Sequence, residues 1–467
     1  MKQLLPVLLL AGCTTLGPDY QRPSVEFPSA YPSGNAGSET AVPLEWWKLY
    51  NDATLEELVA AAQKSNADVR LAAARVREAE AALRETGAAF LPEIGGGYSF
   101  TRNRVSTQTQ PPPQATAPLE RRQHALTAST SFELDFWGRF ARASEAAQAS
   151  LLGSRFNQDT VALTLAGSTA QAYFALRSLD AQIAVLDNTI RVRRDSLEIA
   201  RSRLEAGLAS ELDVHQAQGA LSDALVQRRE AGRNRAVVER QLAQLAGRMD
   251  LKVAGGDLFK LPVPPTPPAG LPSALLDRRP DIRAAEQSLV AANAQIGVAR
   301  AALFPAISLT ATLGAQSAEL SNLFASGAGI WSLGFALAQP IFDSGRREAR
   351  VEQADARREQ ALAGYQRAVE TAFREVSDAL VNVQETTGSE AELAERLQAA
   401  RNALELSSLR YESGYSPYLE VLDAQRTANE AELAFVRNRQ ARLAFSVDLM
   451  KALGGGWAPK QTGSDEH

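Results

Sequence analysis

The sequence predicts an α+β membrane protein made of two copies of one unit, each with a long helical hairpin and two membrane-type strands. Three observations predict this fold class: long proline-free stretches with heptad spacing, short segments of strict alternation, and two halves that align at a fixed offset. Hydrophobic residues make up 45% of the 467 residues and charged residues 22%, which is typical of a folded chain. The net charge of −5 argues against a nucleic-acid partner, which would require a basic stripe.

The N-terminus has the pattern of a signal peptide over residues 1–12. Lys2 is a one-residue basic region, an apolar run follows, and Leu10-Ala11-Gly12-Cys13 forms a small-residue cleavage site. The run is far too short to span a bilayer, which needs roughly 20 residues. Cys13 is the only cysteine, so it forms no internal disulfide. The pattern resembles the bacterial lipobox, which implies a covalent lipid on Cys13, and Thr14 in place of an Asp favours the outer membrane. The alternative is a chance cysteine after an ordinary cleavage site.

Long helices are predicted where proline is missing, from Leu119 to Leu261 and from Ile341 to Ser416. A helix from Arg139 to Glu205 would run for about 67 residues, or roughly 100 Å. Such a helix is a rod, a stalk or the wall of a tube. Mostly apolar residues follow coiled-coil spacing in both stretches: Leu179, Ile183, Leu186, Ile190, Leu197 and Leu204, with Arg193 and Ala200 at the intervening positions, then Leu393, Leu397, Ala400, Leu404, Ser407 and Tyr411.

Four strands are predicted at about 94–104, 126–137, 306–316 and 330–341. In each of them apolar and polar residues alternate, as in a transmembrane strand with one face toward lipid. A soluble sheet with one wet face has the same period and remains the alternative. The expected apolar face includes Tyr98, Phe100, Leu126, Ala128, Thr130, Phe132, Leu134, Phe136, Ile307, Leu309, Ala311, Leu313, Trp331, Leu333, Phe335 and Leu337.

The two long stretches are copies of each other. Gly207 matches Gly414 and Asp213 matches Glu420 at an offset of 207, and the segment 67–94 matches 280–307 at an offset of 213. This gives a lipidated extended segment at 13–45, a first repeat at 46–260 with a hairpin tip near 207, and a Pro-rich linker at 261–273. The second repeat follows at 274–457 with a tip near 414, and 458–467 is a flexible tail.

Four membrane strands cannot close a barrel, and an open edge in lipid leaves backbone groups unsatisfied at several kcal/mol each. The chain must therefore oligomerise if these strands are in a membrane. Two subunits would give about eight strands, which leave room only for side chains in the lumen. A trimer is the smallest assembly that makes a pore.

Motifs along nearly the whole mature chain resemble those of the TolC-like outer-membrane factors, in their OprM/NodT lipoprotein branch. They are "GPDYQRP", "WWKLYNDATLEELVAAA", "LLDRRPDIRAAE", "ALFPAISL", "QPIFDSGRR", "YLEVLDAQR" and "KALGGGW", in this order. The resemblance implies a homotrimer, with a twelve-strand β-barrel in the outer membrane that continues into a periplasmic α-barrel of paired helices.

By the same resemblance the protein is the passive outer-membrane duct of a tripartite efflux system for drugs or other small solutes. Its partners would be a periplasmic adaptor (a membrane fusion protein), an inner-membrane pump of the RND type, and outer-membrane lipid. The alternatives are the outer-membrane duct of a type I protein secretion system and a periplasmic coiled-coil scaffold lipoprotein. An exit duct need not recognise its cargo, so the sequence leaves the substrate open.

No constellation of residues indicates an enzyme. The histidines His124, His215 and His467 fall in separate segments, and the one cysteine provides neither a thiol–imidazole pair nor a zinc site. We therefore predict no catalytic residue, no metal ligand and no cofactor besides the lipid on Cys13.

The second hairpin is the predicted gate. The resemblance implies that Leu419 forms an apolar constriction at the periplasmic end of the tunnel, and that Glu420 and Asp423 form acidic rings there, which could bind a divalent cation. In the alternative interpretation the acids favour the helix dipole and Asp423 pairs with Arg426. The tips, which are implied to contact the adaptor, are Ala206, Gly207, Leu208, Ser413, Gly414 and Tyr415. The family pattern differs at a short signal basic region and at His215 and Gln216, which match Leu422 and Asp423.

Overall fold

The computed structural model describes residues 15–25, 28, 31, 42–106, 108, 119–268 and 272–457. Cys13, the signal peptide and the tail at 458–467 lie outside these residues, as does part of the Pro-rich linker. The chain divides into two compact units. One contains the strands and is made of the chain up to Pro23, with 77–153 and 285–364, while the other contains 24–76, 154–284 and 365–467.

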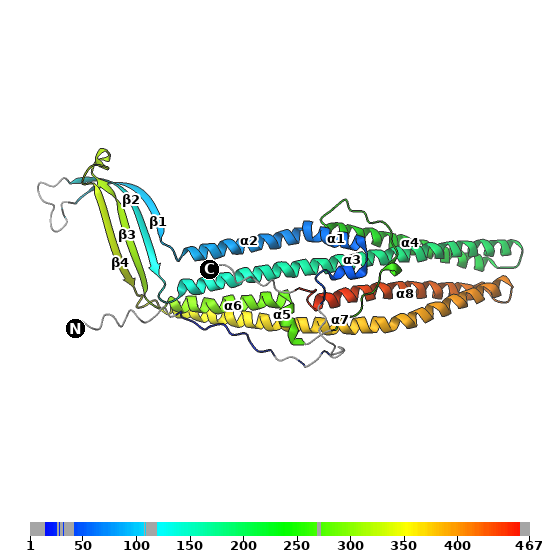
Figure 1. Cartoon of the computed structure of the whole chain (residues 1–467). Helices are drawn as coiled ribbons and strands as arrows, with labels where there is room; N and C mark the ends of the chain where they lie inside the picture. The colour runs from blue at the N-terminus through cyan, green and yellow to red at the C-terminus, as the bar shows by residue number, and fades with distance from the viewer. Residues whose placement is uncertain are drawn as a thin grey trace. The chain divides into compact units, whose positions relative to one another are not determined.

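The strands form one antiparallel sheet in the order β1-β2-β3-β4 (Figure 1). They are β1 (Glu93–Arg104), β2 (Glu120–Leu134), β3 (Ala306–Ser317) and β4 (Gly329–Ala338). Phe132 lies opposite Leu309, which lies opposite Phe335, so the predicted apolar residues of these strands share one face. We call it the apolar face of the sheet. Its large side chains are exposed, including Ile94, Tyr98, Phe100, Leu126, Leu309, Leu313, Trp331, Leu333, Phe335 and Leu337.

Three strand bounds differ from the sequence prediction. β2 starts at Glu120 instead of 126, because the charged segment before Leu126 pairs with Ser99–Arg104 of β1 although it does not alternate. β2 also ends at Leu134 instead of 137, since the Asp135 carboxylate accepts a hydrogen bond (2.9 Å) from Ala141 N–H in the next helix. β4 ends at Ala338, shortly before Pro340, which has no N–H to donate. Phe136 and residues 339–341 are therefore outside the strands.

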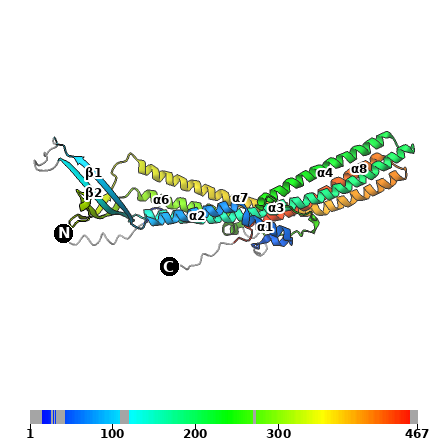
Figure 2. The ribbon, with the colours of Figure 1, turned by 90° about the horizontal axis from the view of Figure 1, so that it is seen from above.

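The duplication is visible in the helix lengths. α3 (Arg139–Glu205) and α7 (Arg346–Glu412) have 67 residues each, and α4 (Glu211–Leu245) and α8 (Tyr418–Ala452) have 35 each. α2 (Ala67–Ala88) and α6 (Pro280–Ala301) have 22 each. The turns of the two hairpins lie at the same end of their unit (Figures 1 and 2). The shorter helices are α1 (Ala53–Ser65), α5 (Leu275–Arg278), η2 (Trp46–Tyr50), η3 (Leu258–Lys260), η4 (Pro272–Ala274) and η5 (Leu320–Asn322).

The predicted coiled-coil seams form much of the core of the helical unit. Leu186, Ile190 and Leu197 of α3 are buried, as are Leu397 and Tyr411 of α7. The core near the hairpin turns joins the two repeats, because residues of α3 and α4 pack with Tyr411, Tyr418 and Val421 of the second hairpin. None of the helices in the described ranges combines the length and apolar character that a membrane span requires.

In the strand-bearing unit, the segment Thr15–Arg22 is bound to α3 and α6. The Arg22 guanidinium holds the Glu286 carboxylate with two hydrogen bonds of 2.7 and 2.8 Å, and Arg142 contacts Asp19 at 2.6 Å. Gly17 packs so closely on Gly297 that an added Cβ would lie 2.6 Å from the Gly297 Cα. The motif "GPDYQRP" thus fixes the extended N-terminal segment to the helices.

Candidate functional site: the ends of the two helical hairpins

The two hairpin turns have the same backbone geometry. Gly207 and Gly414 have φ angles of +70° and +79°, which glycine adopts without a Cβ clash. Gly207 N–H donates to the Leu204 carbonyl (2.9 Å) and Leu208 N–H to the Arg203 carbonyl (2.7 Å). The corresponding bonds of Gly414 and Tyr415 are 3.0 and 2.8 Å. Both helices end in a Schellman motif, which leaves all six predicted tip residues exposed.

The helices that follow the turns start differently. In the first hairpin Ser210 and Asp213 form a capping box, with hydrogen bonds of 3.1 and 3.3 Å between side chain and backbone. In the second hairpin Pro417 occupies the N-cap position, and it has no side-chain cap. Glu420, the counterpart of Asp213, is thereby free for another partner.

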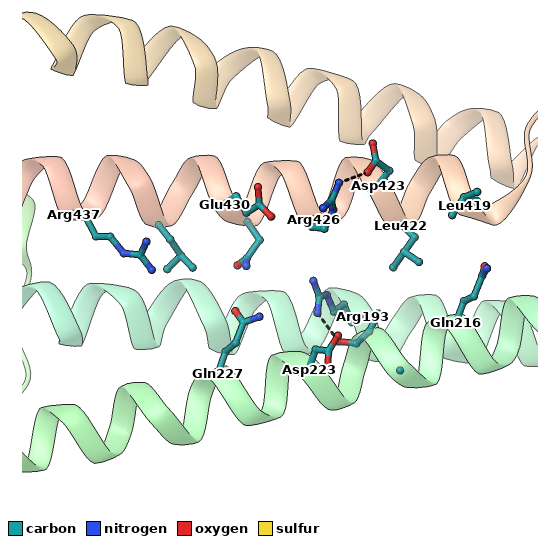
Figure 3. A pocket seen from close by; sticks show the side chains of 14 residues that line it. Arg193, Gln216, Asp223, Gln227, Leu419, Leu422, Asp423, Arg426, Glu430 and Arg437 are labelled. Atoms are coloured by element: carbon teal, nitrogen blue, oxygen red, sulfur yellow. Dashed lines mark hydrogen bonds and ion pairs between the residues drawn. The ribbon is translucent and has the colours of Figure 1, made fainter.

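Leu419 and Asp423 line one cavity of about 640 Å³ between α8 and the first hairpin. Side chains of α8 face those of α4 and Arg193 of α3 across this cavity (Figure 3). Leu419 is 58% exposed, as expected for a side chain that faces open space. We call this space the hairpin cavity.

Glu420 does not join them. Its carboxylate pairs with the Arg410 guanidinium of α7 at 3.0 Å, and it is not among the residues that line the hairpin cavity. Asp423 pairs with Arg426 at 2.8 Å, which is the alternative considered for it above. The predicted gate set is therefore split: Leu419 and Asp423, at i and i+4, share one face of α8, whereas Glu420 is rotated about 100° from Leu419 and faces α7.

The lining of the hairpin cavity carries both signs of charge. Asp223, Asp423 and Glu430 are its acids, and Arg193, Arg426 and Arg437 are its bases. Within one chain the cavity lining is thus a polar surface of mixed charge, and the acidic rings implied for an assembly of several chains stay a prediction.

An arginine joins the two hairpins near their tips. Arg203 of α3 donates to the Tyr411 carbonyl at 2.8 Å, and its guanidinium lies 4.7 Å from the centre of the Tyr411 ring. The Tyr411 carbonyl, which already accepts from Gly414 N–H, thereby gains a second donor, and the positive charge near the end of α7 favours the helix dipole. Arg410, its counterpart in the second repeat, instead pairs with Glu420.

Two tyrosines pack together next to Arg203. Tyr411 and Tyr418 pack with ring centres 5.4 Å apart, and Tyr418 is 1% exposed. Burial raises the pKa of Tyr418 to about 12, and burial also raises the pKa of Tyr411. Both side chains therefore stay neutral and hold the start of α8 against the end of α7.

Arg193 is a buried base at a position of the α3 seam between Ile190 and Leu197. Its guanidinium donates to the Ala220 carbonyl and lines the hairpin cavity. Burial lowers the pKa of this guanidinium. Other residues of the cavity lining did have a signal in the sequence. Asp423, Glu430 and Arg437 of α8 recur at seven-residue spacing, and so do Gln216 and Asp223 of α4, so each set lies on one helix face.

Across the described part of the chain, no group of three or more His, Cys, Asp or Glu side chains could hold a metal ion. The predictions of no metal site, no cofactor and no catalytic activity stay predictions, and so does the lipid on Cys13.

Comparisons with known proteins agree with this architecture. The family model described as outer membrane efflux protein matches residues 58–248 and 271–455, which are the two repeats. The toluene efflux pump outer membrane protein TtgF of Pseudomonas putida is 35% identical, and the alignment covers 96% of this chain and 95% of TtgF. The cation efflux system protein CusC of Escherichia coli is 33% identical over 97% of this chain and 99% of its own.

The solved structure of the MtrE outer membrane channel of Neisseria gonorrhoeae, in its open state, has 30% identity and a TM-score of 0.84. It covers 95% of this chain and 98% of MtrE. These matches confirm the predicted resemblance, the fold class of long helices with four strands per chain, and the outer-membrane location. The chain belongs to the outer membrane efflux protein family and is the outer-membrane channel component of an efflux system.

Proposed function

We propose that three copies of this chain form a passive exit duct, with the four strands of each copy contributing to a closed twelve-strand barrel. The exposed apolar face of the sheet supports this assembly, because large side chains such as Trp331 and Leu333 need a nonpolar environment. β1 and β4 are the edges of the sheet and need partner strands in lipid. Two copies would give an eight-strand barrel, whose interior is filled by side chains, whereas three copies give a barrel wide enough for a lumen.

Cys13 carries the lipid anchor in this proposal. Its support is the sequence pattern around Cys13, together with the bound segment Thr15–Arg22 that starts two residues later.

The hairpin cavity is the gate of the proposed duct. Threefold repetition would bring three copies of Leu419 and Asp423 around one axis, where the leucines exclude water and the carboxylates attract cations. Glu420 acts through Arg410, since its carboxylate holds that guanidinium at the end of α7. Glu420 is therefore a positioning residue, and Leu419 and Asp423 line the passage.

The exposed tips, with Leu208 and Tyr415 at 71% and 81% exposure, are the proposed contact for a periplasmic adaptor. An inner-membrane pump of the RND type would supply energy and select the cargo. Among the relatives, TtgF is named for toluene and CusC for cations, so we assign the cargo only as small solutes. The deletion strain should become more susceptible to some drugs, metals or solvents while its secreted proteins stay unchanged.

Conductance in planar bilayers tests the duct and the gate together. The wild-type protein should give discrete conductance steps, and Asp423→Ala and Leu419→Ala should raise the open probability or weaken block by Mg²⁺. Gln216→Ala is the matched control, because Gln216 is the repeat counterpart of Asp423 and also lines the hairpin cavity. A folded protein that never conducts would instead be a scaffold. Equal effects of Asp423→Ala and Gln216→Ala would remove the gate from the second hairpin.

A further inference from the structure

The end of the β1–β2 pair farthest from the helices carries a cluster of arginines on the apolar face of the sheet. Arg102 lies directly opposite Arg122, and Arg104 lies opposite Glu120. Because side chains alternate along a strand, Arg102 and Arg104 project to the same side as Tyr98 and Phe100. We call Arg102, Arg104 and Arg122 the strand-end arginines.

The rows of the apolar face follow the layers of a bilayer leaflet. From Leu134 to Leu126 the face of β2 is apolar, then His124 lies opposite Phe100, and the arginine row comes next. Tyr98 and His124 are joined by a hydrogen bond of 2.8 Å, and the Phe100 and His124 rings lie 4.6 Å apart. A band of aromatic residues followed by charge is typical of the level where hydrocarbon meets headgroups.

The strand-end arginines have few partners of their own. Glu120 pairs with Arg102 at 2.6 Å, which neutralises one charge. In the described part of the chain, Arg104 and Arg122 make neither an ion pair nor a side-chain hydrogen bond with another residue, and Arg122 has only a longer-range electrostatic interaction with Glu120. Like charges directly opposite each other destabilise a strand pair. An anion between the guanidinium groups would remove this cost.

The other strand pair has no such cluster. Between Ser317 and Gly329, where β3 turns into β4, there is one acid, Glu319, and no lysine or arginine. The positive charge is therefore a property of the β1–β2 end and does not occur at every strand end of the sheet.

We propose that the strand-end arginines bind the phosphate groups of an outer-leaflet glycolipid. The planar guanidinium matches phosphate oxygens with two parallel hydrogen bonds, and the aromatic band beside it packs against the acyl chains. This site rests on the proposed placement of the strands in the membrane. It makes the β1–β2 edge a lipid-binding surface in addition to a wall of the barrel.

Lipid retention by the purified full-length protein tests the site, with diphosphoryl lipid A as the probe and native mass spectrometry as the readout. The double variant Arg102→Gln with Arg122→Gln should retain roughly 25-fold less, at about fivefold for each arginine near a charged surface. Arg121→Gln is the matched control, since Arg121 neighbours Arg122 in sequence but lies opposite Asn103 on the other face. Retention should be lost when the phosphates are removed from lipid A.

Each result decides the proposal. Equal loss in the double variant and in Arg121→Gln would overturn it, as would equal retention of dephosphorylated lipid A. If phosphatidylglycerol vesicles displace lipid A, the site binds anionic lipids in general and the assignment to a glycolipid is wrong. If inorganic phosphate displaces it, the site binds a free anion. Conductance of the double variant should match the wild type, so failure of the lipid site is distinguishable from failure of the duct.

Discussion

Tyr418, the first residue of α8, is buried and packs against Tyr411 of α7 beside the second hairpin turn. Its folded pKa of about 12 is above the usual value of 10. The neutral ring is thus favoured in the folded state, and this contribution to stability is complete below pH ~10 and is lost as the pH rises toward ~12.

Tyr418→Phe should therefore reduce the loss of stability between pH ~10 and ~12, as followed by thermal unfolding of the helices. Other buried tyrosines with raised pKa values, such as Tyr173, would leave part of that dependence in place. Tyr415→Phe makes the same change at an exposed tip and should leave the curve unaltered. Identical curves for wild type and Tyr418→Phe would contradict this role.

At the residue scale, the structure brings two of the three predicted gate residues together, while their role as a gate stays a prediction. Leu419 and Asp423 share a cavity, and the Asp423–Arg426 pair follows from i, i+3 spacing on a helix. The Glu420–Arg410 pair could not be predicted, since its partners lie on opposite arms of the hairpin. The link from Arg203 to the end of α7 depends on how the two repeats pack, and no local pattern encodes this.

The element that depends most on one residue is the hairpin turn. Gly414→Ala forces a Cβ into the left-handed region at φ +79°, at a cost of about 1–2 kcal/mol. The last turn of α7 should then exchange its amide hydrogens faster, because the bonds from Gly414 and Tyr415 loosen. Hydrogen exchange followed by mass spectrometry of the tip peptides measures this.

Gly364→Ala is the control within the same helix. An added Cβ at Gly364 meets nothing within 4 Å, and its φ is helical. Alanine there should stabilise α7 by roughly 0.5–1 kcal/mol. If both variants change exchange in the same direction, the Schellman geometry is not what holds the tip.

At the element scale, helices were easier to predict than strand ends. The offset of 207 and the proline-free stretches predict where α3 and α7 begin and end. Each helix starts directly after a glycine and ends two residues before another. Alternation marks only the part of a strand with one apolar side. The start of β2, from Glu120 to His124, pairs through its backbone with β1 and carries polar side chains on both faces, so it has no such pattern.

On the scale of the whole molecule, the anchor on Cys13 and the bound segment after it should be separable. Cys13→Ser should abolish labelling with radioactive palmitate, since the thiol is the only proposed acceptor. Gly17→Val keeps the lipobox but places a side chain against Gly297, so it should keep the label while the segment Thr15–Arg22 becomes sensitive to protease. A labelled Cys13→Ser protein would overturn the lipobox assignment.

The equal lengths of the repeated helices determine which changes of length the chain tolerates. One inserted residue in α3 would rotate every later side chain of that helix by about 100°, so buried residues such as Leu197 would leave the seam. One inserted residue in α7 would disrupt the seam of the second hairpin in the same way. An insertion in one hairpin could not compensate for an insertion in the other. β2 and β4, with 15 and 10 residues, have already diverged in length. Insertions and deletions should therefore accumulate at the strand ends in related chains, while the four long helices change length only by whole heptads.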